Sequence, residues 1–193
     1  RASGRVGRPA VIADFADNPG GGGYCDSTDV LAGMLAAGLE DAAISPIVDR
    51  VSVEACRAAG LGATLTLAVG GKVDPALFPP LEVTGRVTHL GDGRFVIKGP
   101  MMRGLAIDLG PTATFKTGGV EIVLASRRFQ NYDLGFFEVA GIDPTQRAVL
   151  AVKSMQHFRA AYAPIAGDIV VVDEGGGITS HDIRRLPFTK VRR

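Results

Sequence analysis

The chain has 193 residues, of which 46% are hydrophobic and 21% charged, and its formal net charge is +1. A chain of this length buries a substantial core without disulfides or a structural metal, and its composition excludes a disordered or fibrous class. The near-neutral charge argues against nucleic-acid binding, and no apolar run approaches the roughly 20 residues that span a bilayer. The two cysteines, Cys25 and Cys56, lack the CxxC spacing of metal sites and are expected to be free thiols. We therefore expect a folded, cytoplasmic chain with no nucleic-acid or membrane partner.

Predicted strands and helices alternate through the first third of the chain. Apolar runs that end at turn residues indicate buried strands, and apolar residues at helical spacing after Asp26, Ser27 and Thr28 indicate a helix with a choice of N-caps. The expected elements are a strand at 9–15, a helix at 28–39, a strand at 42–49, a helix at 52–59 stopped by Gly60, and a strand at 63–71. This alternation predicts a parallel sheet with right-handed crossovers.

The pattern changes near Leu81, where apolar and polar residues alternate about the turns Asp92-Gly93 and Gly118-Gly119. Such alternation about glycine turns predicts antiparallel hairpins. The last third returns to the earlier style, with a strand expected at 148–154, a helix at 155–166 capped by Ser154, and a buried strand at 168–177. The predicted fold class is α/β, a mostly parallel or mixed sheet flanked by helices, with an antiparallel hairpin insertion near residues 81–126.

A loop with four consecutive glycines, Gly20 to Gly23, follows the first predicted strand. It lacks the lysine of the P-loop pattern GxxxxGK[ST], and Cys25 stands where the dinucleotide pattern GxGxxG needs a glycine. Asp26, at the mouth of the following helix, also disfavours a bound pyrophosphate. The loop is therefore a tight strand-to-helix connection with several positive-φ glycines, a flexible segment, or one wall of a site that is completed elsewhere.

Polar side chains gather at the predicted carboxyl ends of the strands, where loops converge in open α/β sheets. The segment VKSMQHFR offers a cation, a hydroxyl and an imidazole, in Lys153, Ser154 and His157, that could bind a carboxylate or stabilise an oxyanion. The alternative is a solvated lysine, a helix-capping serine and a histidine that packs against the sheet.

Two familiar catalytic arrangements find little support in the sequence. A nucleophilic set of Cys25, His157 and Asp26 can be drawn, although nothing in the sequence brings the three side chains together. The three histidines, at 89, 157 and 181, are too scattered to form a self-contained zinc site. We therefore assign no catalytic residue and no metal ligand in this chain.

Three long segments occur in an order that resembles the C-terminal domain of the MlrC (microcystinase C) metallopeptidase family: ADNPGGGGYCDSTDVLAGML, AAGLGATLTLAVGGK and GIDPTQRAVLAVKSMQHFRAAYAPIA. The likeness covers nearly the whole chain and is loosest from about Leu81 to Thr117. It implies a two-part protein that hydrolyses linear peptides, with zinc held by an N-terminal domain and no metal held by this one. Arg1 is not a start methionine, which agrees with the expectation that residues 1–193 are a single domain of a longer polypeptide. The isolated chain is then expected to be inactive.

The resemblance implies that this domain completes or stabilises the active site of a zinc-dependent peptidase or amidohydrolase. Zinc-bound water would attack the amide carbonyl, while groups of this domain would bind polar atoms of the substrate or the developing oxyanion. Its partners would be the N-terminal metallopeptidase domain of the same polypeptide and a peptide or other amide substrate. The alternatives are a purely structural or oligomerisation module and a module that independently binds a small ligand or phosphate. The residues expected to bind substrate or line the site are Asp17, Asn18, Gly20, Gly21, Gly22, Asp26, Ser27, Thr28, Arg128, Lys153, Ser154 and His157.

Overall fold

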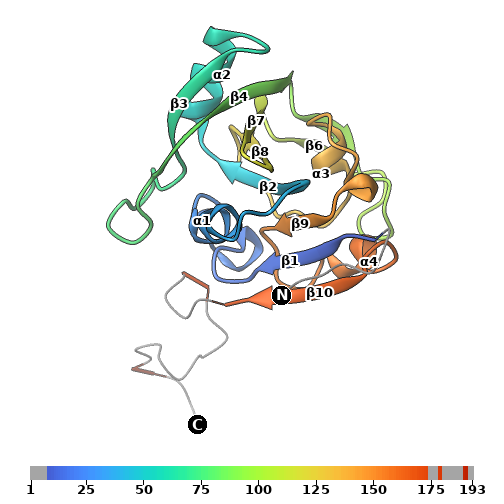
Figure 1. The fold of residues 1–193 in the computed structure, drawn as a ribbon. Helices are drawn as coiled ribbons and strands as arrows, with labels where there is room; N and C mark the ends of the chain where they lie inside the picture. The colour runs from blue at the N-terminus through green and yellow to red at the C-terminus, as the bar shows by residue number, and fades with distance from the viewer. Residues whose placement is uncertain (1–7, 174–177, 180–188, 191–193) are drawn as a thin grey trace.

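An eight-stranded sheet forms the centre of the computed structural model, which describes residues 8–173, 178–179 and 189–190 (Figure 1). The strands lie in the order β10-β1-β9-β2-β8-β7-β4-β3, and two short strands, β5 and β6, form a separate pair. The strands of the main sheet are β1 (Ala10–Asp14), β2 (Ala42–Val48), β3 (Thr64–Val69), β4 (Leu81–Gly91), β7 (Thr112–Thr117), β8 (Val120–Ala125), β9 (Val149–Val152) and β10 (Asp168–Val172). The predicted α/β class with a mixed sheet is confirmed.

The sheet has a parallel half and an antiparallel half. From β10 through β1, β9 and β2 to β8, every pair of neighbours is parallel. Beyond β8, each pair is antiparallel: β7 with β8, β4 with β7, and β3 with β4. The carboxyl ends of β1, β9, β2 and β8 therefore lie along one edge, where the loops that follow them meet.

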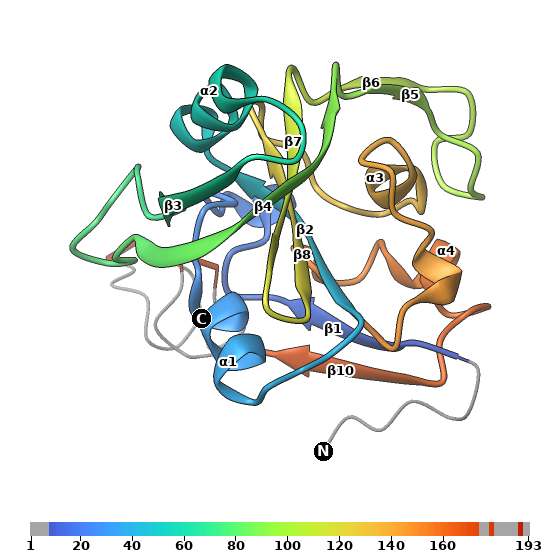
Figure 2. The same ribbon diagram turned by 45° about the horizontal axis from the view of Figure 1, so that its top comes forward.

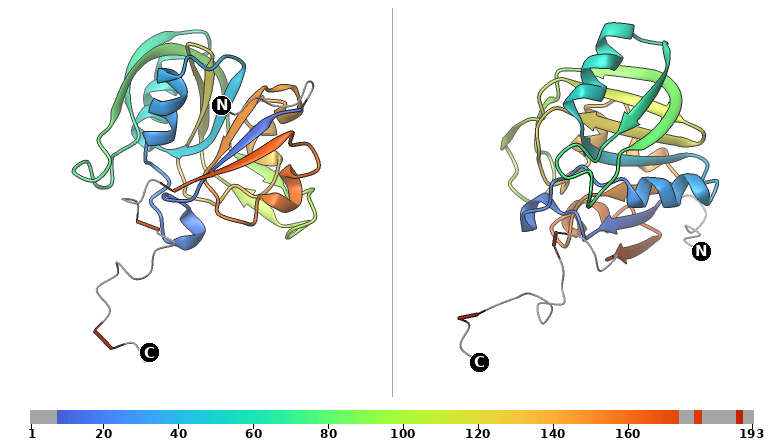
Figure 3. Two further views of the ribbon diagram at one scale, coloured as in Figure 1. Left: turned by 60° about the horizontal axis from the view of Figure 1, so that its bottom comes forward. Right: turned by 90° about the vertical axis from the view of Figure 1, so that its left-hand side faces the viewer.

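Short helices cover both faces of this sheet. They are α1 (Asp29–Ala36), α2 (Arg50–Ala59), α3 (Gly135–Glu138) and α4 (Arg159–Tyr162), with 3-10 turns at Pro19–Gly21 and Pro144–Gln146. Because side chains alternate along β2, Ile44 packs in the cluster under α1 and α2, and Ala43 packs in the cluster under α3 and α4. Figures 2 and 3 show α1 and α2 on one side of β2 and α3 and α4 on the other.

The third predicted strand is not part of the parallel half. The structure places it as β3 at the antiparallel edge, where Leu67 pairs with Val83 of β4. In β3 the threonines at 64 and 66 are exposed, whereas Leu67 and Val69 are buried. One solvated face is typical of an antiparallel strand, whereas parallel strands are usually covered on both faces. The expectation of a parallel third strand was therefore wrong.

The predicted hairpin insertion is confirmed at one turn and wrong at the other. Gly118-Gly119 joins β7 to β8 as expected. No hairpin forms at Asp92-Gly93, because β4 pairs with β7, while β5 (Arg94–Val96) pairs with β6 (Ala106–Asp108). The reason lies in packing: Phe95 meets Phe136 edge to face, with ring centroids 5.0 Å apart, in a small cluster of its own away from β4.

The predicted helix at 155–166 shortens to the single turn of α4, and Ser154 does not cap it. The hydroxyl of Ser154 is buried and instead accepts a hydrogen bond from Gln130 Nε2 at 3.0 Å. The predicted helix at 28–39 also ends early, at Ala36, and Gly38 beyond it has φ of 60°. The last predicted strand is observed as β10, which ends at Val172, but the expectation that it is buried was wrong, since β10 lies at the edge of the sheet and Val170 and Val171 are exposed. Residues 174–177 and 181 lie outside the described residues.

Both cysteines are buried free thiols, as expected. In the part of the chain that the structure describes, no helix combines the length and apolar character needed to cross a bilayer.

Candidate functional site

A buried lysine lies at the carboxyl edge of the sheet, where β9 ends. Lys153 Nζ contacts Asp14 Oδ2 at 2.8 Å, Asp17 Oδ2 at 3.0 Å and Ser27 Oγ at 2.7 Å. These contacts occupy all three donors of the ammonium group, whose side chain is 0% exposed. Burial alone would lower the pKa of Lys153, but the negative charges of Asp14 and Asp17 outweigh it and hold the pKa above its usual value. Lys153 is therefore a permanent buried cation that joins β9 to β1 and to the loop after β1.

Asp17 links this ion cluster to the backbone of the glycine loop. Its Oδ1 accepts the N–H of Cys25 at 2.7 Å, and its Oδ2 accepts the N–H of Ser27 at 2.8 Å. A carboxylate that accepts backbone N–H groups while it contacts a cation is held in one orientation. The sequence analysis put Asp17, Ser27 and Lys153 at one edge, but it did not single out Asp14, the polar last residue of an otherwise apolar strand, which completes the cluster.

The glycine loop above this cluster is tightly folded. Gly20 N donates to Asn18 Oδ1 at 3.1 Å, and the N–H groups of Gly21, Gly22 and Gly23 donate to loop carbonyls. None of these four N–H groups is left to bind an anion, so the loop is not a phosphate cradle. This agrees with the failed P-loop and dinucleotide patterns.

Among the four loop glycines, only Gly22 has a positive φ, of 100°. Position 23 requires glycine for lack of space, because an added Cβ would lie 2.6 Å from the carbonyl carbon of Asp17. The expectation of several positive-φ glycines in the loop was wrong. Gly20, Gly21 and Gly22 are exposed and present backbone without side chains at the surface.

A polar rim lies beside the glycine loop, and its three side chains come from the segments after β8 and β9. Gln130 Oε1 lies 3.3 Å from His157 Nδ1, and it also stands next to Gly20, where a side chain would collide with it. Arg128 Nη1 donates to the carbonyl of Gly23 at 3.1 Å. Because an amide oxygen only accepts hydrogen bonds, His157 Nδ1 carries the proton in this arrangement, and Nε2 is the acceptor of the neutral ring. We call Arg128, Gln130 and His157 the rim residues.

Asp26 holds a neighbouring loop and does not act as a helix cap. Its Oδ2 accepts the N–H groups of Lys72 at 2.8 Å and Val73 at 2.9 Å, and its Oδ1 is buried without a hydrogen-bond partner among the described residues. Thr28 is the N-cap residue of α1, but its hydroxyl donates to the carbonyl of Pro79 and makes no capping bond. The helix-capping interpretation of Asp26, Ser27 and Thr28 was therefore wrong for the side chains.

Asp49 is a second carboxylate that the sequence analysis missed. It caps α2 by accepting the N–H of Ser52 at 3.0 Å, and its Oδ2 accepts the N–H of Gly70 at 2.9 Å. The sequence signal was present, since Asp49 follows a strand and stands three residues before a serine, a pattern typical of an N-cap. Asp26 and Asp49 together fix the segment that follows β3.

The drawn set of Cys25, His157 and Asp26 is not assembled. The thiol of Cys25 is buried and donates to the carbonyls of Pro46 at 3.5 Å and Phe129 at 3.9 Å. Burial raises the pKa of this thiol well above its usual value, and the positive charge of Lys153 offsets that only in part. Across the described residues, no group of three or more histidine, cysteine, aspartate or glutamate side chains has an arrangement that could hold a metal ion.

The structure therefore divides the predicted site residues into two layers. Asp17, Asn18, Asp26, Ser27, Thr28, Lys153 and Ser154 are buried, and Gly20, Gly21, Gly22, Arg128 and His157 are exposed. Direct contact of either layer with a substrate stays a prediction. The geometry defines an α/β fold with an internally hydrogen-bonded glycine loop and a polar rim at the carboxyl edge of its parallel strands.

Comparison with known proteins identifies the family. Residues 12–190 match the family described as MlrC C-terminus, and the chain belongs to this family. It is 33% identical over 164 residues to microcystinase C from a Sphingomonas species, an alignment that covers 85% of this chain and 32% of the relative. The crystal structure of a candidate metallopeptidase from Mesorhizobium sp. BNC1 superposes with a TM-score of 0.83 and 28% identity, covering 96% of this chain and 37% of that one. The chain thus spans about a third of the length of these relatives.

Proposed function

We propose that this domain completes the substrate side of a peptidase or amidohydrolase active site, whose catalytic metal is held by another domain of a longer polypeptide. The described residues of this chain do not fit a zinc ion, since no cluster of suitable ligands is present among them. The relatives are about three times as long as the region that this chain matches, which leaves room for a metal-binding domain. We propose no chemical step on the metal for this chain.

The observation that carries the proposal is the exposed and rigidly supported glycine loop with the three rim residues around it. Glycines at 20, 21 and 22 let a substrate or a facing domain approach the backbone closely. Because the N–H groups of Gly20 to Gly23 are all used within the loop, hydrogen bonds donated to a substrate at the glycines would come from the rim side chains. Arg128 would bind a carbonyl oxygen or developing oxyanion, and His157 would accept a hydrogen bond at Nε2.

The buried layer has a positioning role in this proposal. Lys153 holds the ends of β1 and β9 together through Asp14 and Asp17, and Asp17 in turn holds the backbone after the glycine loop. Sites built on rigid supports keep their hydrogen-bonding groups oriented before substrate arrives, which lowers the cost of ordering them during the reaction. A purely structural module would also be stabilised by this cluster. The experiment must therefore distinguish a role in substrate binding from a structural role.

The test is to replace each rim residue in the full-length protein and to measure hydrolysis of a linear peptide. We expect Arg128→Ala and His157→Ala to lower kcat/KM by about tenfold or more, because a lost charge-assisted hydrogen bond is worth about 1.5–3 kcal/mol. Arg103→Ala, at an exposed arginine in the turn between β5 and β6, is the matched control and should retain full activity.

Bound zinc and the thermal unfolding temperature are measured for every variant. A loss of activity with normal metal content and stability supports the proposed role. If Arg128→Ala and His157→Ala both keep kcat/KM within about twofold of the parent, the domain does not complete the site, and the structural alternative is favoured.

A further inference from the structure

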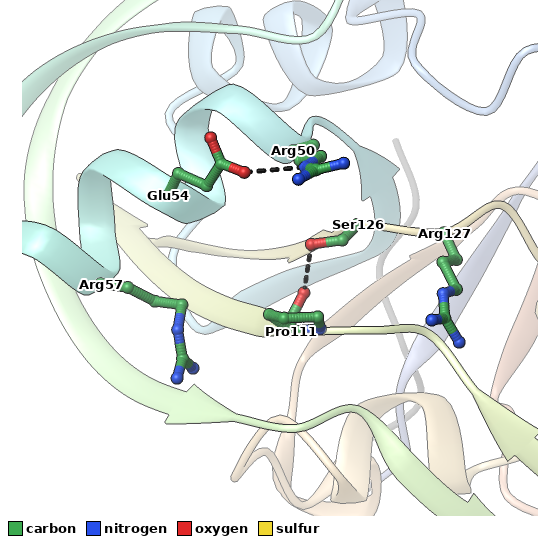
Figure 4. A pocket seen from close by; sticks show the side chains of 6 residues that line it. All are labelled: Arg50, Glu54, Arg57, Pro111, Ser126 and Arg127. Carbon is green, nitrogen blue, oxygen red and sulfur yellow. Dashed lines mark hydrogen bonds and ion pairs between the residues drawn. The ribbon is translucent and has the colours of Figure 1, made fainter.

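A pocket lined mostly by charged residues lies at the same edge of the sheet, beyond the ends of β2 and β8. It has a volume of about 360 Å³ and is lined by Arg50, Glu54, Arg57, Pro111, Ser126 and Arg127. Figure 4 shows three guanidinium groups around Pro111 and Ser126. A neighbouring pocket of about 240 Å³ shares Arg57, Pro111 and Arg127, so the two form one groove. None of these residues belongs to the glycine loop or its rim.

The arginines are placed by regular secondary structure. In α2, Arg50, Glu54 and Arg57 recur at spacings of four and three residues and share one exposed helix face, while Ser52, Val53 and Cys56 are buried on the other. The third arginine, Arg127, lies two residues beyond the end of β8, and its backbone N–H donates to the carbonyl of Leu109 at 2.8 Å. The backbone positions are therefore fixed before any ligand arrives.

Positive charge exceeds negative charge in this pocket. Three arginines and one carboxylate, that of Glu54, line the pocket. Glu54 pairs with Arg50 at 2.7 Å, and both side chains are mostly exposed, at 76% for Arg50 and 61% for Glu54. Arg57 has no ion-pair partner among the described residues and donates only to the carbonyl of Gly91, at 3.2 Å. Exposed pairs of this kind contribute little to stability, so their guanidinium groups can turn toward an anion at small cost.

At the outer side of the groove, a carboxylate, that of Asp108, partly neutralises the arginine charges. Arg127 contacts Asp108 at 2.6 Å, and Arg94 contacts the same carboxylate at 3.6 Å. The hydrogen bond from Gly110 N–H, followed by the charges of Arg127 and Arg94, lowers the pKa of Asp108, so it stays ionised at neutral pH and orients the two arginines. Arg57 thus offers a guanidinium group that has no carboxylate partner among the described residues, whereas Arg50, Arg94 and Arg127 each have one.

We propose that this pocket binds the oxyanion group, carboxylate or phosphate, of a small molecule, with Arg57 and Arg127 as the principal contacts. Planar guanidinium groups bind both kinds of anion through paired hydrogen bonds. The volume lies at the low end of the range for small-molecule sites, so it suits a compact anion. Anion binding at this pocket does not depend on the proposed peptidase role, because the 193-residue chain itself should bind the anion.

The experiment is a calorimetric titration of the 193-residue chain with inorganic phosphate and, separately, with the tricarboxylate tricarballylate, at low ionic strength in a chloride buffer. We expect saturable binding of at least one of the two anions. Arg57→Gln and Arg127→Gln should each weaken binding by about tenfold or more, since each removes charge-assisted hydrogen bonds. Glu54→Gln should tighten it several-fold, because it removes the one carboxylate that lines the larger pocket.

Arg86→Gln is the matched control, since Arg86 is also exposed and also donates to a backbone carbonyl, that of Gly62. It lowers the net charge by the same amount and should leave binding unchanged. Binding of phosphate alone, of tricarballylate alone or of both supports the site and identifies the source of the anion. Absence of binding for both anions, or binding that Arg57→Gln and Arg127→Gln weaken no more than Arg86→Gln does, overturns the proposal.

Discussion

Replacing the buried lysine is the most direct test of how the candidate site is held in place. Lys153→Met removes the charge and nearly keeps the length of the side chain, which leaves Asp14 and Asp17 as two buried carboxylates without their cation. Removing one partner of a buried ion pair costs about 3–5 kcal/mol, because the remaining charge is uncompensated. For a chain of this size, we expect the unfolding temperature to fall by about 6–20 °C at pH 7.

The pH dependence follows from the same contacts. In the parent, the pKa of Lys153 is raised on folding, so the stability that it contributes is fully present below about pH 10.5 and is lost only as pH rises through the folded value. Above pH 10.5, the parent should therefore lose stability more steeply than the variant.

The assay is urea unfolding followed by circular dichroism at pH 7, pH 10 and about pH 11.5, with two comparison variants. Lys98→Met removes a lysine that is 79% exposed and paired at the surface with Glu138, and we expect no measurable loss of stability. The double variant Lys153→Met with Asp14→Asn removes one uncompensated charge and should recover part of the loss. A Lys153→Met variant within about 1 kcal/mol of the parent at pH 7 would refute the role of the cluster as a fixed support.

Three further predictions test other parts of the structure. Gly23→Ala should destabilise the chain by about 2 kcal/mol or more, because the added Cβ meets fixed backbone, whereas Gly33→Ala in the open face of α1 should stabilise it by about 0.5–1 kcal/mol, both measured by urea unfolding. Cys25 should not react with a thiol reagent at pH 8 in the folded chain, since burial raises its pKa, and should react once urea unfolds it; rapid labelling of the folded chain would contradict this. Tyr162→Phe should cost about 1–2 kcal/mol by leaving buried Asn131 Oδ1 without its 2.7 Å hydrogen bond, and an unchanged urea midpoint would show that this bond contributes nothing net.

The proposed anion pocket and the proposed rim lie along one edge, and each has its own readout. Binding of phosphate or tricarballylate is measured on the 193-residue chain, whereas peptide hydrolysis needs the longer protein. A negative result for anion binding therefore does not refute the proposed role of the rim, and a negative result for peptide hydrolysis does not refute the anion pocket. Positive results for both would place two recognition surfaces side by side at the ends of β1, β9, β2 and β8.

Much of the fold was predictable because it depends on local patterns. Apolar runs identified β1, β2 and β9, and the spacing of apolar residues identified α1. Gly60 marked the end of α2, and the Gly118-Gly119 turn identified the β7–β8 hairpin. These signals are properties of segments of four to twelve residues, where periodicity and turn chemistry act directly on the backbone. The convergence of polar residues at one sheet edge followed from the general rule for open α/β sheets.

The tertiary structure decided how these segments meet and which polar groups remain free. Lys153 is 139 residues from Asp14 and 126 from Ser27, and only the placement of β9 beside β1 brings their side chains into contact. Lys153 is buried by that contact, whereas Arg128 and His157 are exposed. Residue type and spacing do not predict which of these polar side chains are buried. The direction of β3, the shortness of α4 and the partner of β5 were likewise set by long-range packing. By itself, the sequence determined the elements and the edge where they gather, while charge pairing and burial across the sheet determined which side chains there are supports and which can reach a ligand.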